Sequence, residues 1–145
     1  MAYKYTCAVY LCLLLVACRS PTLYTPSVDE VLADLPTYSS VDEIWRVVAN
    51  LPYVPSGREF VDPRITLEEG GDCADVSGLF MALCRKIGVE TTLIGIIVRG
   101  TTGHAFIKLG EKYIEPQIYG IRYTEPKNIY MELSLQDYIT LMHSA

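Results

Sequence analysis

The sequence predicts one α+β domain, in which helices precede and follow a meander of antiparallel strands. Three observations lead to this fold class. The chain has 145 residues, 50% of them hydrophobic and 20% charged, without repeats or low-complexity tracts, as expected for a globular domain with an ordinary core. Apolar residues recur with helical spacing over residues 41–51 and 76–87. Residues 91–123 are instead rich in β-branched side chains and glycine-containing turns, which is typical of strands.

The first 17 residues are typical of an export signal and are set apart from the folded domain. Lys4 precedes an apolar run at residues 8–17 that is too short to span a bilayer as a permanent helix. The run ends in LVAC at residues 15–18, which resembles the signal-peptidase box of bacterial lipoproteins. That resemblance implies a mature chain that begins at an acylated Cys18 and is anchored to a membrane of the bacterial cell envelope. A plain secretory peptide with an incidental cysteine is the alternative.

The segment after the signal, residues 18–39, is predicted to be a tether. It carries three prolines among serine, threonine and tyrosine, a composition that favours an extended linker, with room for a short helix at 28–35. The folded domain is therefore expected at residues 40–145. Residues 52–69 hold three further prolines and are expected to form a loop between its first two helices.

Three helices are predicted within this domain, each from its cap residues and its apolar periodicity. Their expected ranges are 40–49, 73–87 and 134–142. Ser40 and Ser134 are suitable N-caps for the first and the last helix. Asp72 can cap the middle helix, with Asp75 completing a capping box, and Gly88 is expected to end it.

Strands are expected at residues 91–99, 104–109 and 112–117, with strand content continuing to about Tyr123. A two-residue loop at residues 110–111 would join the second and third strands as a hairpin. In that register His104 and Glu115 are diagonal neighbours on one face of the sheet, about 7 Å apart at Cα and within side-chain reach. A loop longer by one residue would send them to opposite faces.

The stretch GGDCAD at residues 70–75 carries the strongest functional signal, because it places Cys73 in the first turn of a helix. Unpaired backbone amides and the helix dipole favour an anion there, which activates a thiol as a nucleophile. His104 is the candidate base and Glu115 the candidate carboxylate that orients it. A nucleophile, a base and an orienting acid form the constellation that covalent acyl transfer requires.

The remaining cysteines have simpler explanations. Cys7 and Cys12 belong to the predicted signal, and Cys18 is the predicted lipidation site. Cys73 and Cys84 are separated by about 16 Å along the expected helix, at about 1.5 Å per residue. A disulfide requires Cα atoms within about 7 Å, so these two cannot pair. Cys84 lies on the apolar stripe of the helix and is expected to be a small core residue.

Residues 60–117 resemble the transglutaminase-like superfamily of papain-type thiol enzymes, and most closely its bacterial cysteine peptidases. The matching blocks are PRITL at 63–67, GDCADVS at 71–77, HAF at 104–106 and YIEP at 113–116. The resemblance implies a papain-like core, in which the helix with the cysteine packs on an antiparallel sheet that carries the histidine and the acid. It also implies that Cys73 is the nucleophile, His104 the base and Glu115 the orienting acid.

Three positions depart from the pattern of that family. Glu115 stands where the family usually has Asp, a longer side chain with the same chemistry. Ala74 stands where the peptidase branch often has an acid, and calcium-dependent members use acids beside the cysteine; no metal or cofactor is expected here. The aromatic anchor before the proline block is not clearly placed. Phe60 and Trp45 are candidates for this anchor, so no side chain is assigned to the oxyanion hole. The Cys73 backbone amide would supply its other part.

Together these features predict a membrane-tethered thiol hydrolase or acyltransferase that acts on amide bonds through a thioester. Within this class, a cysteine peptidase is the leading prediction. Its substrate would be a protein or peptide amide, peptidoglycan peptides included. The net charge of −5, without a basic stripe, argues against nucleic acid as a partner. An envelope lipoprotein that keeps the fold but binds its ligand with little turnover is the alternative. Zinc on Cys73 and His104 is disfavoured, because no further Cys or His lies nearby in the sequence.

Overall fold

The computed structural model of the chain describes residues 24–55, 60–98, 100 and 102–143. The predicted signal peptide and the predicted lipidation site at Cys18 lie outside these residues. Within the described part of the chain, no helix combines the length and the apolar character needed to cross a bilayer.

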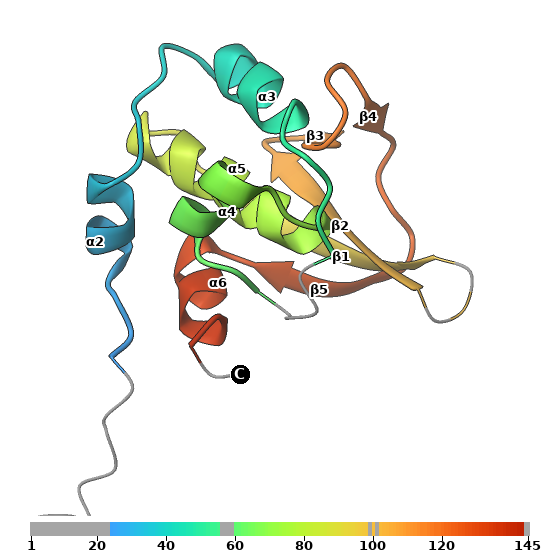
Figure 1. Cartoon of the computed structure of the whole chain (residues 1–145). Coiled ribbons are helices and arrows are strands. Elements are labelled where there is room, and N and C mark those ends of the chain that lie inside the picture. Colours follow the sequence, from blue (N-terminus) through green and yellow to red (C-terminus); the bar gives the residue numbers. More distant parts are fainter. Residues whose placement is uncertain (1–23, 56–59, 99, 101, 144–145) are drawn as a thin grey trace, which may run out of the picture.

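Helices and strands are segregated along the chain, as Figure 1 shows. Their order is α2 (Val28–Ala33), α3 (Val41–Ala49), α4 (Pro63–Glu69), α5 (Cys73–Lys86), β1 (Thr92–Val98), β2 (Thr102–Leu109), β3 (Lys112–Ile114), β4 (Arg122–Tyr123), β5 (Ile129–Leu133) and α6 (Leu135–Leu141). The strands form one antiparallel sheet in the order β4-β3-β2-β1-β5. The α+β class is therefore confirmed.

Helix α5 is the centre of the molecule. It packs on β1 and β2 and also contacts each of the other described helices, which lie around it (Figure 1). Ten consecutive residues from Asp75 to Cys84 are buried. Alternation along the strands then separates two apolar layers. Leu93 and Ile107 belong to the core beneath α5, whereas Ile94 and Phe106 form a smaller cluster with Tyr113.

The predicted helix ends are confirmed. Ser40 and Ser134 cap α3 and α6. Asp72 caps α5, and it shares a capping box with Asp75. Gly88, just beyond α5, has a φ of 76°. That left-handed conformation suits glycine after a helix, because it carries no Cβ.

The predicted tether at residues 18–39 needs a correction, because its second half belongs to the folded domain. Within α2 and just after it, Val31 is 0% and Leu35 3% exposed. The Lys86 ammonium on α5 donates to the carbonyls of Leu32, at 2.7 Å, and Leu35. The domain therefore begins before residue 40. A six-residue helix is too short to show a clear apolar periodicity in the sequence.

Two elements were not predicted. The expected loop at 52–69 contains α4, which Asp62 caps and Pro63 begins. Proline is suited to that first position, because its missing N–H would have no partner within the helix. Strand β5 was also missed; it pairs with β1, and the register shifts between Gly95 and Ile96.

Candidate active site

Cys73 is the first residue of α5 and is half-buried. The Asp72 carboxylate accepts hydrogen bonds from the amides of Ala74, at 2.9 Å, and Asp75, at 3.2 Å. The Asp75 carboxylate accepts in return from the Asp72 amide at 3.2 Å and from the Val61 amide at 3.0 Å. This double cap holds the first turn of α5 in place and leaves the thiol at the surface of a cavity.

The other described cysteine differs in its burial. Cys84 is 0% exposed in the core, and burial raises the pKa of its thiol to about 12. Both Cys73 and Cys84 are free thiols. The predictions that Cys84 is a core residue and that the two do not form a disulfide are confirmed.

The β2–β3 hairpin has the predicted two-residue loop. Leu109 pairs with Lys112, and Gly110 between them has a φ of 56°. Continued beyond the pair of Ile107 with Ile114, this register places His104 diagonally opposite Glu115 on one face of the sheet. Nε2 of His104 lies 2.7 Å from Oε2 of Glu115. The expected pairing of the histidine with the acid is therefore present.

His104 also reaches the thiol, so the three predicted residues lie together. The pKa of His104 is raised to about 10. The largest cause is its side-chain hydrogen bond with Cys73, and the second is its hydrogen bond with Glu115; partial burial opposes both. Since Nε2 is engaged by Glu115, Nδ1 is the ring nitrogen that remains for the sulfur. The imidazole is thus held between the Cys73 thiol and the Glu115 carboxylate, and these two hydrogen-bond partners favour its protonated form at neutral pH.

Glu115 is buried, with only 2% of its surface exposed, yet it is well supplied with donors. Its carboxylate accepts from His104, from the Tyr123 hydroxyl at 2.8 Å and from the Gln117 amide at 3.2 Å. Burial alone would raise the pKa of Glu115, but the hydrogen bonds from His104 and Tyr123 outweigh it and lower that pKa. A buried carboxylate with three donors can remain charged and so stabilise an imidazolium.

The sequence did not predict the roles of two residues that support Glu115. Trp45 donates its indole N–H to the backbone carbonyl of Glu115 at 2.7 Å. Tyr123 supplies a hydrogen bond to the Glu115 carboxylate and packs near His104, with ring centroids 6.5 Å apart. A tyrosine-rich stretch after the third strand is a signal in the sequence, but it does not distinguish packing from function.

The segment after Glu115 is fastened to α3. The hydroxyl of Tyr119 donates to Asp42 at 2.5 Å and accepts from Arg46 at 2.7 Å. The Arg46 guanidinium also lies 4.3 Å from the centre of the Tyr119 ring, and the Trp45 and Tyr119 ring centroids are 5.2 Å apart. Helix α3, which lies early in the chain, thus helps to position Glu115.

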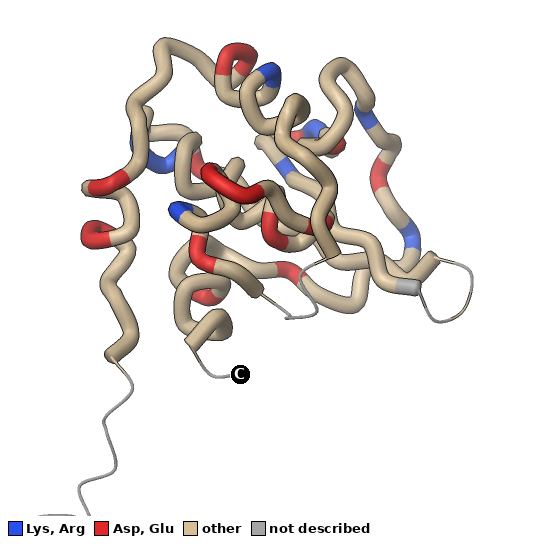
Figure 2. Tube along the Cα trace, in the orientation of Figure 1, with Lys and Arg blue, Asp and Glu red and all other residues tan. Residues whose placement is uncertain are grey.

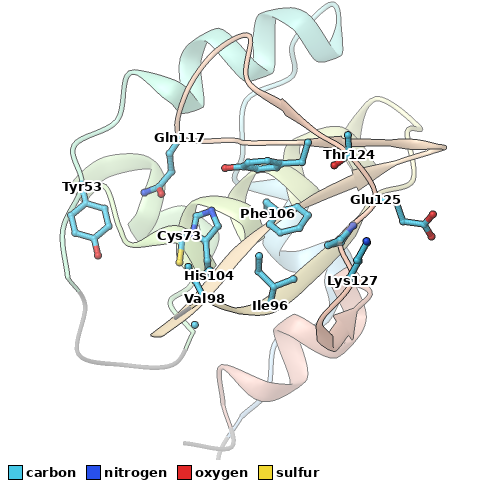
Figure 3. A pocket seen from close by; sticks show the side chains of 13 residues that line it. Tyr53, Cys73, Ile96, Val98, His104, Phe106, Gln117, Thr124, Glu125 and Lys127 are labelled. Atoms are coloured by element: carbon cyan, nitrogen blue, oxygen red, sulfur yellow. The ribbon is translucent and has the colours of Figure 1, made fainter. Parts of the chain in front are cut away.

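Neither candidate for the aromatic anchor has a donor free for the oxyanion. The Trp45 N–H is engaged by Glu115, and Phe60, which has no donor, packs edge-on against Tyr138 with ring centroids 5.1 Å apart. Figure 3 shows other polar side chains around Cys73, among them Tyr53 and Gln117, which line the same cavity.

Two cavities meet at Cys73 and His104. The larger, of about 800 Å³, extends over the sheet face that carries Ile96 and Phe106 (Figure 3). The smaller, of about 480 Å³, lies toward Phe60 and α6. A substrate can therefore approach the sulfur and the imidazole together. Within the described residues, no three Cys, His, Asp or Glu side chains gather closely enough to hold a metal ion.

No family model, curated protein or solved structure matches this chain. The relation to transglutaminase-like enzymes thus stays a prediction from the motifs. The arrangement of Cys73, His104 and Glu115 is what supports a functional proposal.

Proposed function

We propose that this protein is a thiol hydrolase or acyltransferase that acts on amide bonds of proteins or peptides, and that peptide-bond hydrolysis is its principal reaction. One observation carries the proposal. A half-buried thiol at the start of a helix is hydrogen-bonded to His104, whose Nε2 is bound by the buried carboxylate of Glu115. Nucleophile, base and orienting acid are thus in contact in the order that covalent catalysis needs.

In the first half of the reaction the Cys73 thiolate attacks the amide carbonyl carbon and forms a tetrahedral intermediate. The backbone amide of Cys73, in the first turn of α5, is the donor proposed for the developing oxyanion. The C–N bond then breaks as imidazolium His104 gives its proton to the leaving amine. The products of this half are a free amine and a thioester on Cys73.

In the second half, water or a second amine attacks the thioester, and neutral His104 accepts its proton. The C–S bond breaks and releases a carboxylic acid or a new amide together with the thiolate. Glu115 keeps the imidazole oriented throughout and stabilises its charged form, as its short contact with Nε2 allows.

We also propose that the domain works at a membrane of the bacterial cell envelope. The LVAC box at residues 15–18 supports acylation of Cys18. Residues 18–27 would then link that anchor to α2. Mass spectrometry of the cell-derived protein tests this point, since acylation adds the mass of the lipid to Cys18.

The thiol can be tested without knowing the substrate. With iodoacetamide at neutral pH, we expect Cys73 to react much faster than Cys84, because Cys84 is sealed in the core. His104→Ala should abolish this advantage, since it removes the base, while His143→Ala, which changes the other histidine, should leave it intact. Peptide mapping by mass spectrometry separates the two thiols.

Acylation is the decisive step for an enzyme. Incubation with an envelope extract, as the source of substrate, should give a thioester-linked adduct on Cys73 that is absent from Cys73→Ser. Equal and slow labelling of Cys73 and Cys84, with no adduct, would contradict the catalytic proposal and favour the alternative of a binding lipoprotein.

A further inference from the structure

We propose that the larger cavity beside Cys73 is a subsite for an apolar, preferably aromatic, side chain of the substrate. The proposal rests on the function proposed above and adds a substrate class to it. The cavity has about 800 Å³ of space, within the range of about 300 to 1,000 Å³ that is usual for ligand sites. It includes both Cys73 and His104 in its lining, so its occupant would lie next to the reacting bond.

The floor of this cavity is one face of the sheet. Ile94 pairs with Phe106 and Ile96 with His104 across β1 and β2, so these four side chains share a face. Phe106, at 1% exposure, is buried together with Ile94 and Tyr113, and Ile96 packs against that cluster. The imidazole of His104 therefore lies at the edge of this apolar floor, and Phe106 on the same strand, β2, is part of the floor.

Aromatic rings form one side of the same space. The Tyr123 and Phe106 ring centroids are 5.0 Å apart. The Tyr123 hydroxyl is engaged by Glu115, so the ring, and not the hydroxyl, is what this 40% exposed residue offers to the cavity. A substrate ring could pack against these rings in the offset or edge-on arrangements that aromatic pairs prefer.

Apart from His104, the charged side chains of this cavity lie at its rim. Figure 2 shows β1 without a charged residue, and among the residues lining the cavity the charged side chains besides His104 are Glu125 and Lys127. Both are exposed, and in Figure 3 they lie on the side of the cavity away from Cys73. A charged substrate group placed over Ile96 and Phe106 would lose its hydration, because neither side chain offers it a polar partner. An apolar substrate group would instead bury its own apolar surface and that of the cavity.

Alkylating reagents of different shape test the cavity directly at Cys73. We compare iodoacetamide, N-benzyl iodoacetamide and N-carboxymethyl iodoacetamide, and divide each rate by that for N-acetylcysteine. We expect the benzyl reagent to modify Cys73 about tenfold or more faster than iodoacetamide, because its ring enters the apolar cavity. The carboxymethyl reagent should show no such gain.

Two matched variants locate the effect. Val98 lines the larger cavity and is 37% exposed; Leu141 lines the smaller one and is 36% exposed. Val98→Asn should reduce the benzyl preference to about threefold or less, since it replaces an apolar contact by an amide. Leu141→Asn should leave the preference unchanged. In each variant the rate with iodoacetamide itself reports whether the thiol and the fold are intact, and the benzyl preference is the ratio to that rate.

Cleavage sites provide the readout for substrate class. When a denatured protein mixture is digested, residues with apolar or aromatic side chains should be enriched at one position beside the cleaved bond, and Val98→Asn should weaken that enrichment.

The possible failures are distinguishable. Fast alkylation of Cys73 by iodoacetamide without a benzyl preference would overturn the subsite and leave the proposed function standing. A preference lost in Leu141→Asn but kept in Val98→Asn would overturn it as well, because the ring would then occupy the smaller cavity. Slow alkylation of Cys73 by all three reagents would overturn the proposed function, and the subsite with it.

Discussion

His104 shows how two neighbours can determine the properties of one residue. The thiol of Cys73 and the carboxylate of Glu115 both raise its pKa, to about 10, although burial opposes them. The same contact acts in the other direction on Glu115, whose pKa is lowered in spite of burial. An imidazolium that persists at neutral pH is the proton donor that amide cleavage requires.

Glu115→Gln should lower the pKa of His104 toward its ordinary value of 6.5. The substitution keeps the shape of the side chain but removes the charge that stabilises the imidazolium. NMR titration of the imidazole resonances measures this pKa, and His143 in the same spectra is the internal control. An unchanged titration of His104 would contradict the role assigned to the carboxylate.

Helix α5 shows how an element is held from several directions. Its N-terminus is capped by Asp72 and Asp75, and Asp75, at 0% exposure, also accepts from the Val61 amide. In its middle, Gly78 lies against the ring of Tyr138 on α6. The position of Cys73 thus depends on contacts with the segment before α4 and with the last helix.

Asp75→Ala should destabilise the protein by about 2 to 3 kcal/mol, because it removes the acceptor of the half-buried Val61 and Asp72 amides. Asp137→Ala provides the matched control: Asp137 has the same place in the capping box of α6, but it is exposed. That change should reduce stability by about 1 kcal/mol. Urea unfolding of both variants measures the difference, and equal losses would refute the structural role of Asp75.

Gly78→Ala should destabilise the fold, although alanine is favoured over glycine within a helix by about 1 kcal/mol. A Cβ at this position would come within 2.2 Å of Cζ in the Tyr138 ring, which is 0% exposed and cannot move aside. Crowding of this kind reduces stability by about 1 to 3 kcal/mol or more. Thermal unfolding decides the sign; a stabilised variant would show that α6 can shift away from α5.

At the scale of the whole molecule, the domain includes segments that are distant in the sequence. Helix α2 packs on α5 and α6, and α3 supports the acid of the candidate site through Trp45. Arg64 joins these early and middle segments by pairing with Asp34 at 2.8 Å and with Asp62 at 2.7 Å. Removing the first part of the domain would therefore affect the core as well as the site.

A chain that starts at residue 40 should be less stable than one that starts at residue 24 by about 3 kcal/mol or more, the contribution of two buried aliphatic side chains. Val31 and Leu35 are those side chains. Urea unfolding of the two chains is the measurement. Equal stabilities would mean that α2 adds nothing to the core.

The pH dependence of stability follows from the His104–Glu115 pair. Glu115 has a lowered pKa, so its contribution is present above its ordinary value of 4.5 and is lost as the pH falls below it. His104 has a raised pKa, so its contribution is complete below 6.5 and is lost as the pH rises toward about 10. The difference in unfolding free energy between the unaltered protein and Glu115→Gln should therefore be largest between about pH 4.5 and 6.5. A difference that does not vary from about pH 3 to pH 9 would contradict this account.

Local rules were enough to predict much of this protein from its sequence. Capping residues and apolar periodicity predicted α3, α5 and α6, because a helix end depends on a few neighbouring residues. The two-residue loop at residues 110–111 determined the pairing of His104 with Glu115, since strand register follows from the length of the turn.

The tertiary structure alone decided what depends on contacts between distant segments. It placed Cys73 against His104, Trp45 on the carbonyl of Glu115, α2 in the core and β5 beside β1. The motif blocks implied the first of these contacts, and the other three have no signature in the neighbouring sequence. They form because the assembled domain must bury apolar surface and supply partners for buried polar groups, and both conditions are met only when the whole chain is folded.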